Sequence, residues 1–326
     1  MIVPDYYGRF RCIGGECRHN CCRGGWDVEV DDEALARFDA IPGEFGSRVR
    51  AAINDENVFI HKDGHCPLLS DDGWCEMVRH DIPLCIICDE YPRFTEFWDD
   101  YTERGISLSC EAAAEIILNN ADKVALTGET GACDEPIFTF IYNVRSEIFK
   151  LLQDRDTDIM TRLRLALDYA YKAQERINEN IYEPLIYTPA DGGAERRSAA
   201  AYIDLLRRLE ILESDWGELL DSTYKREIKC AAHDYDELKT EQLSVYFVYR
   251  YFMKGAFDCD VLSKMKLAAL SVLAICAVAD TGIGLAEAAR RYSVEVEHDE
   301  DNTDMIYDEL MFDEELSYDN LLQMLH

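Results

Sequence analysis

Nine cysteines crowd the first third of this sequence, and their thiols are the side chains best able to do chemistry. They form two clusters and one later position: Cys12, Cys17, Cys21 and Cys22; Cys66, Cys75, Cys85 and Cys88; and Cys110. Short spacings let neighbouring sulfurs converge on a metal at a small cost in loop closure. The clusters therefore predict one large metal site or two smaller ones.

Two kinds of metal centre suit these thiolates. Tetrahedral zinc would use four of them, with His19 or His65 as further candidates, and would leave about five cysteines unexplained. An iron–sulfur cluster held by four cysteine thiolates is equally compatible with the ligand type. Common zinc motifs pair two Cys-x2-Cys units, and only Cys85–Cys88 supplies such a unit here. An ordinary zinc ribbon is a poor match, and the choice between iron–sulfur and zinc stays open.

The redox environment follows from the N-terminal residues. The segment MIVPDYYGRF shows neither the basic nor the apolar region of a secretory signal. We therefore expect a cytoplasmic, reducing environment, in which cysteines serve as thiols or metal ligands. The three later cysteines, at positions 230, 259 and 276, fall on predicted helical faces, and we interpret them as small buried apolar side chains.

The charge balance narrows the range of partners. The 326 residues include 33 Lys and Arg against 65 Asp and Glu, which gives a net charge of −32, and the basic residues form no dense cluster. A nucleic-acid-binding protein carries a basic stripe, so nucleic acid is excluded as a partner. An acidic surface attracts cationic partners, and a protein substrate that presents lysines fits it. A general role in keeping the protein soluble explains the negative charge as well as a cationic partner does.

Familiar catalytic motifs are missing from the sequence. It contains no HExxH, GxSxG or GxxxxGK[ST] motif, and no GxGxxG that follows a strand. The longest apolar run, residues 267–279, is shorter than the roughly 18 residues that a membrane-spanning helix needs. We therefore expect a buried core helix there and no membrane insertion.

The pattern of apolar residues divides the chain at about residue 134. Residues 1–134 are rich in Cys, Pro and Gly and predict an irregular metal-binding module with little β structure, in which residues 26–30 could pair with 58–60. From Pro136 a period of 3.6 residues predicts an all-α bundle over 135–326. The fold class is therefore mainly α. The expected helices are 136–152, 159–177, 199–212, 216–232, 243–257 and 261–279, with a loop at 185–197 and a docked acidic helical segment within 295–319.

Several of these segments together resemble the flagellin lysine-N-methylase family, and the N-terminal part resembles the YkgJ-type cysteine module that chelates zinc or iron. The resemblance covers nearly the whole chain. The segments that carry it are 10–26 (FRCIGGECRHNCCRGGW), 66–75 (CPLLSDDGWC), Cys85-x2-Cys88 with Tyr91-Pro92-Arg93, Ser107–Ala112 (SLSCEA), 246–257 and 292–298. The family implies methylation of lysine side chains on flagellin, with S-adenosylmethionine as donor and a [4Fe-4S] cluster held by the N-terminal cysteines.

A lysine methylase must bind its donor and deprotonate its acceptor. The ordinary pKa of lysine is near 10.4, so the ammonium has to lose a proton before the nitrogen can attack. Trp26 and Tyr91 are candidates for an aromatic wall in the cofactor and substrate site, and Arg93 is a candidate donor of hydrogen bonds to the cluster or to a ligand carboxylate. The sequence identifies no catalytic residue.

Two other classes of protein remain compatible with the same cysteines. One is a non-catalytic interaction module with structural zinc. The other is an electron-transfer or metal-handling protein whose cluster is redox-active but binds no methyl donor. Colour, metal content and a response to S-adenosylmethionine would distinguish the three.

Overall fold

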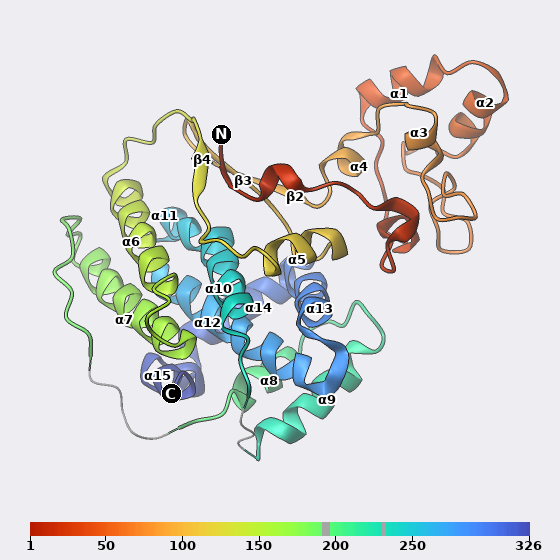
Figure 1. Cartoon of the computed structure of the whole chain (residues 1–326). Coiled ribbons are helices and arrows are strands. Elements are labelled where there is room, and N and C mark those ends of the chain that lie inside the picture. The colour runs from red at the N-terminus through yellow and green to blue at the C-terminus, as the bar shows by residue number, and fades with distance from the viewer. Residues whose placement is uncertain (191–195, 230–232) are drawn as a thin grey trace.

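The chain is mainly α, as the sequence predicted, with a small four-stranded sheet (Figure 1). The structure is a computed structural model that describes residues 1–190, 196–229 and 233–326. Its strands are β1 (Ile2–Pro4), β2 (Arg93–Trp98), β3 (Tyr101–Ile106) and β4 (Leu126–Gly128). Its helices are α1 (Asp32–Asp39), α2 (Gly43–Ala51), α3 (Glu76–Arg79), α4 (Ile86–Glu90), α5 (Glu111–Leu118), α6 (Pro136–Leu152), α7 (Ile159–Asn178), α8 (Ala200–Leu206), α9 (Trp216–Glu227), α10 (Glu237–Tyr251), α11 (Gly255–Asp258), α12 (Val261–Val278), α13 (Leu285–Glu297), α14 (Glu300–Phe312) and α15 (Tyr318–Met324).

The cysteine-rich segment forms a small lobe with its own hydrophobic core. Figure 1 shows α1–α4 grouped at one side of the molecule, apart from the helices of the larger body. The core of this lobe includes Phe38, Phe59 and Met77, and Cys85 is buried among them. The Asp31 carboxylate joins two helices of the lobe. It accepts hydrogen bonds from the backbone N–H of Ala34 at the start of α1 and from the backbone N–H of Ile86 at the start of α4.

The sheet has the strand order β2-β3-β1-β4. Strands β2 and β3 form an antiparallel hairpin in which Trp98 pairs with Tyr101, and Asp99 in the turn adopts a left-handed conformation that aspartate tolerates. The pairing expected between residues 26–30 and 58–60 is reduced to one antiparallel bridge, Glu29 with Val58. Strand structure is therefore as scarce as predicted, but it lies mostly elsewhere.

The larger body is built around α12, which packs against α7, α10, α13 and α14. The segment Val261–Ile283 is long and apolar enough to cross a membrane. Its most apolar stretch of 18 residues has a mean hydropathy of 1.9, yet 94% of that stretch is buried inside the fold. This burial is typical of a core helix, as the sequence predicted. The body also takes in residues from before position 134, since Phe10, Trp98 and Ile117 share its core. The domain division at 134/135 stays a prediction.

Most expected helices form close to their predicted bounds. Helix α6 covers Pro136–Leu152 and α12 covers Val261–Val278, as the apolar period indicated. Helix α8 is shorter than expected and ends at Leu206, and α10 starts earlier than expected because Asp236 caps it. Parts of the expected helix 216–232 and of the loop 185–197 lie outside the described residues. The acidic segment after residue 295 is docked, since Ile306 and Leu316 are buried.

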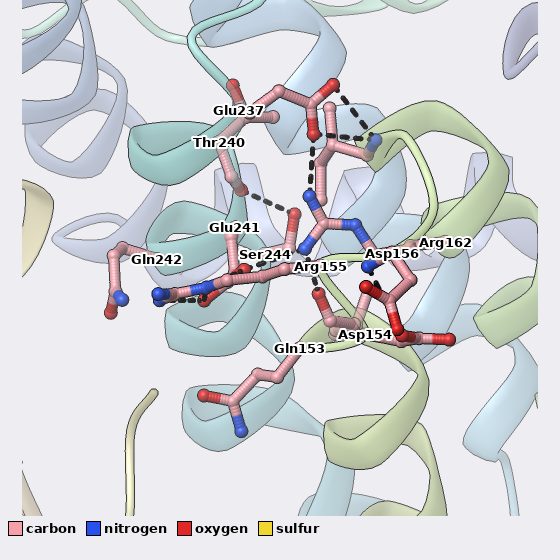
Figure 2. Close-up of polar contacts among 12 residues, drawn as sticks. Gln153, Asp154, Arg155, Asp156, Arg162, Glu237, Thr240, Glu241, Gln242 and Ser244 are labelled. Atoms are coloured by element: carbon pink, nitrogen blue, oxygen red, sulfur yellow. Dashed lines mark hydrogen bonds and ion pairs between the residues drawn. The ribbon is translucent and has the colours of Figure 1, made fainter. Parts of the chain in front are cut away.

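A network of ion pairs and hydrogen bonds joins α6, α7 and α10 (Figure 2). Glu241 of α10 accepts hydrogen bonds from Arg155, which precedes α7, and from Arg162 within α7. Arg162 also donates to Glu237 at 2.6 Å and to the carbonyl oxygen of Leu152 at the end of α6 at 2.7 Å. The side chains of Arg162 and Glu241 are both buried, at 2% and 1% exposure. Each buried charge is therefore compensated by the other, and the more exposed Arg155 and Glu237 complete the network.

His233 should make the stability of the body depend on pH. Its two ring nitrogens lie 2.6 Å from Glu227 and 2.6 Å from Asp280, and the hydrogen bond to Glu227, opposed by burial, raises the pKa of His233 above its ordinary value. Only the imidazolium donates to both carboxylates. Because the folded pKa lies above the unfolded value of about 6.5, this stabilisation is complete below that pH and is lost as pH rises through the folded pKa.

We therefore expect the unfolding free energy of the wild type to exceed that of His233→Gln by an amount that shrinks as pH rises. Urea denaturation at a series of pH values measures this difference. The matched control is His326→Gln, which changes an exposed side chain and should alter the unfolding free energy by less than about 0.5 kcal/mol. A His233→Gln difference that is constant with pH would contradict the prediction.

Candidate functional site

All nine clustered cysteines line one cavity of about 250 Å³. Most of its walls come from the small lobe, and Cys110 with Ala112 of α5 closes it from the side of the body. The sequence left one site or two open, and the structure brings both clusters and Cys110 to the same space. The cysteines that line this cavity are Cys12, Cys17, Cys21, Cys22, Cys66, Cys75, Cys85, Cys88 and Cys110.

Three of these thiols sit where a helix begins. Cys75, Cys85 and Cys110 are the residues immediately before α3, α4 and α5. The first backbone N–H groups of a helix have no partner within it, and they stabilise negative charge there. These groups favour the thiolate, which is the form of cysteine that binds metals, but burial outweighs them at Cys75 and Cys110 and raises the pKa of both thiols.

The first cysteine cluster is held by Asn20 and by a close glycine contact. The Asn20 side chain accepts a hydrogen bond from the Cys22 N–H at 3.0 Å and donates to the carbonyl oxygen of Gly73 at 2.8 Å. Gly14 has a φ of +51°, and a Cβ there would lie 2.4 Å from the ring of Trp74. Only glycine lets these two loops approach so closely. The contact brings the Cys12–Cys22 segment over the loop that carries Cys66 and Cys75.

The thiols differ in how readily they ionise. A hydrogen bond from the Cys22 thiol, opposed by burial, lowers the pKa of Cys21 to about 7, and Cys88 lowers that of Cys85 to about 7 in the same way. Burial raises the pKa of Cys66 to about 11 and that of Cys17 to about 12. Each close pair therefore contains one thiol that ionises near neutral pH, whereas the Cys17 and Cys66 thiols need a bound cation to become thiolates.

Zinc and an iron–sulfur cluster make different demands on the cavity cysteines. Zinc requires ligand atoms about 2.0–2.3 Å from one point, and within the described residues no three His, Cys, Asp or Glu side chains are grouped to hold one ion. A polynuclear iron–sulfur cluster is bound at separate corners by separate thiolates. Of the two histidines considered for zinc, His19 lines the cavity and His65 does not.

Of the three residues predicted to bind a cofactor, two line the cavity and one does not. Trp26 and Tyr91 line the cavity, with ring centroids 5.4 Å apart, and the Trp26 indole donates to the Cys21 carbonyl oxygen. Arg93 is not among the residues that line it. The Arg93 guanidinium donates to the Asp89 carbonyl oxygen at 2.7 Å and lies over the ring of Phe10. Both contacts are with the protein.

Several residues at the boundary between lobe and body were not identified from the sequence. Glu111, directly after Cys110, accepts hydrogen bonds from the backbone N–H and the guanidinium of Arg18, and Glu287 lies 2.9 Å from His19. The ring of His298, which follows α13, lies 5.2 Å from that of Trp26. Their partners are far away in the sequence. The position of Glu111 beside a clustered cysteine was the one local signal.

The other cysteines lie apart from the cavity. Cys276 is buried within α12, as expected. Cys259 was expected to be buried and is exposed, because it ends α11 in a left-handed conformation instead of lying on a helical face. The Cys133 thiol donates to the carboxylate of Asp99 in the turn between β2 and β3. Cys230 lies outside the described residues. All twelve cysteines that the structure describes are free thiols.

Comparison with known proteins reveals a distant relationship. The lysine-N-methylases of Salmonella typhimurium and Salmonella choleraesuis are each 25% identical to this chain over 145 residues. The match covers 40% of this chain and 35% of each relative, so the chain corresponds to about a third of their length. No family model matches the sequence, and no solved structure matches it. The chain is thus a distant relative of lysine-N-methylases.

Proposed function

We propose that this protein is a lysine N-methyltransferase that uses S-adenosylmethionine and holds an iron–sulfur cluster in the cysteine cavity. The observation that carries the proposal is the convergence of nine cysteines on one cavity in a distant relative of lysine-N-methylases. The cluster is of the [4Fe-4S] type in this proposal, and four of the nine cysteines hold it. When bound, such a cluster supplies either an iron position for the donor's amino and carboxylate groups or a scaffold for the surrounding loops.

The protein's own residues prepare the lysine. The strongly acidic surface draws a lysine-rich segment towards the molecule. At the cavity, Asp27 and the rings of Trp26 and Tyr91 stabilise an arriving ammonium. Apolar side chains such as Leu68 and Met77 then exclude water, which disfavours the charged form and favours the nucleophilic amine.

The test is to purify the protein without oxygen, measure iron, sulfide and zinc, and assay methyl transfer. We expect stoichiometric iron and sulfide, a broad absorption band at about 400 nm typical of cysteine-ligated clusters, and transfer of labelled methyl groups from S-adenosylmethionine to a lysine-rich protein. Colourless protein that contains zinc and transfers no methyl group would instead indicate an interaction module. A cluster that dithionite bleaches reversibly, without methyl transfer, would indicate electron transfer.

We propose flagellin as the acceptor and the cytoplasm as the site of action, on the resemblance stated above. Purified flagellin and an unrelated lysine-rich protein, compared at equal lysine concentration, test the acceptor. A preference of at least tenfold for flagellin is the expected result, since about 1.4 kcal/mol of differential transition-state binding gives this ratio. Equal rates would show that the enzyme does not select flagellin.

A further inference from the structure

Glu297, at the end of α13, carries a carboxylate surrounded by hydroxyl groups. Tyr246 donates to it at 2.8 Å, Tyr251 at 3.1 Å, Ser293 at 2.5 Å and Ser107 at 3.0 Å. Within the described residues Glu297 forms no salt bridge, and its hydrogen-bond donors are neutral. Four donors on one carboxylate from three separate parts of the chain are more than a local helix cap requires.

A continuous series of hydroxyls links Glu297 to the cysteine cavity. The Tyr91 ring lines the cavity, and its OH lies 3.3 Å from Ser109 Oγ. Ser109 Oγ lies 2.9 Å from Ser107 Oγ, which donates to Glu297. Both serines belong to the segment that ends in Cys110, and both are buried, at 4% and 8% exposure. We call Tyr91, Ser109, Ser107 and Glu297 the hydroxyl path.

We propose that the hydroxyl path removes the proton from the acceptor lysine and delivers it to the Glu297 carboxylate. This inference rests on the proposed function, because a methylase has to deprotonate its ammonium substrate. Hydroxyls both donate and accept, so each can pass on one proton as it receives another.

The step is balanced without any further reactant. The lysine N–H bond breaks, and Tyr91 receives that proton while its own passes to Ser109. Ser109 in turn passes its own proton to Ser107, and Ser107 passes its own to Glu297. The products are a neutral amine and a protonated carboxyl. The amine then attacks the methyl carbon of the sulfonium donor. A C–N bond forms, the C–S bond breaks with its electron pair left on sulfur, and a methylammonium and a neutral thioether result.

The surroundings of Glu297 determine which groups can alter its charge. Arg250 of α10 is a cation within electrostatic range of Glu297, and it also pairs with Glu96 at 3.2 Å. The other titratable groups that act on Glu297 or are acted on by it are Tyr246 and Tyr251 of α10, Tyr292 of α13 and the adjacent His298. Burial raises the pKa of Tyr246, Tyr251 and Tyr292 well above the ordinary value, so these phenols stay neutral donors at working pH.

The test compares two serine variants that contact the same network. Ser109→Ala interrupts the hydroxyl path without touching Glu297. Ser293→Ala removes a hydrogen bond to Glu297 and a 3.2 Å contact with Ser107 Oγ, but it leaves the three links from Tyr91 to Glu297 in place. We expect Ser109→Ala to lower the rate of methyl transfer at pH 7 by at least tenfold, and Glu297→Gln by about 100-fold, which is the scale of general base catalysis. We expect Ser293→Ala to stay within about twofold of the wild type.

The pH profile separates proton transfer from a structural role. The deficits of Ser109→Ala and Glu297→Gln should shrink as pH rises towards about 10, because lysine then loses its proton to water. They should also shrink with an acceptor peptide whose amine is less basic than lysine. Iron content, donor binding and thermal unfolding of the variants identify any that fail to fold.

Four outcomes would overturn the inference. Equal losses in Ser109→Ala and Ser293→Ala would assign the network a structural role only. A Glu297→Gln deficit that does not change with pH, in a folded protein that binds the donor, would exclude proton acceptance by Glu297. Wild-type enzyme that transfers no methyl group would overturn the proposed function and this inference with it, whereas an active wild type with unaffected variants would overturn the hydroxyl path alone.

Discussion

Replacing Cys85 and Cys88 together by serine is expected to reduce bound iron to less than a tenth of the wild-type content and to abolish the visible absorption band. These two thiols line the cavity at the start of α4, and a hydrogen bond from Cys88 lowers the pKa of Cys85 to about 7. A serine hydroxyl does not form the thiolate that iron–sulfur clusters require. Iron and sulfide analysis of protein purified without oxygen measures the effect.

The matched control changes two cysteines outside the cavity, Cys133 and Cys259, to serine. This double variant should keep its full iron content, because neither thiol is among the cavity-lining residues. If the Cys85→Ser/Cys88→Ser protein retained full iron and colour, the centre would use other cysteines of the cavity. If both double variants lost iron equally, the cavity would not be the site of the metal.

Replacing Glu241 by glutamine should lower the free energy of unfolding by about 3–5 kcal/mol. The change leaves the buried guanidinium of Arg162 with the exposed Glu237 as its remaining carboxylate partner, and it removes the partner of Arg155 (Figure 2). A buried charge without a partner keeps its desolvation penalty and loses the compensating attraction. Urea denaturation followed by circular dichroism measures the loss.

An exposed glutamate provides the control for this charge change. Glu147 pairs with Lys150 one turn along α6, both are exposed, and Glu147→Gln should cost less than about 0.5 kcal/mol. Replacing both buried partners, as Arg162→Met with Glu241→Leu, should recover much of the stability, since no buried charge is then left alone. A loss below about 1 kcal/mol in Glu241→Gln would show that Arg162 is neutralised by other groups.

The sequence predicted the helical body because helix formation leaves a local pattern. Apolar residues at 3.6-residue spacing and Pro136 in the first turn identified α6 to the residue, and the apolar run after Val261 identified the buried helix α12. The hairpin of β2 and β3 was not predicted, because its turn, Asp99-Asp100, lacks the glycine that usually marks a short hairpin. Its strands depend on packing against the body.

The sequence by itself determined that thiol chemistry dominates the first third of the chain, since spacings such as that of Cys85 and Cys88 are local. Only the tertiary structure decided that nine sulfurs share one cavity, and that Tyr91 there connects through two serines to Glu297, more than 200 residues away. The contact between Ser107 and Glu297 joins residues 190 positions apart. Such contacts leave no periodic trace in sequence, because they arise when separately specified elements pack together.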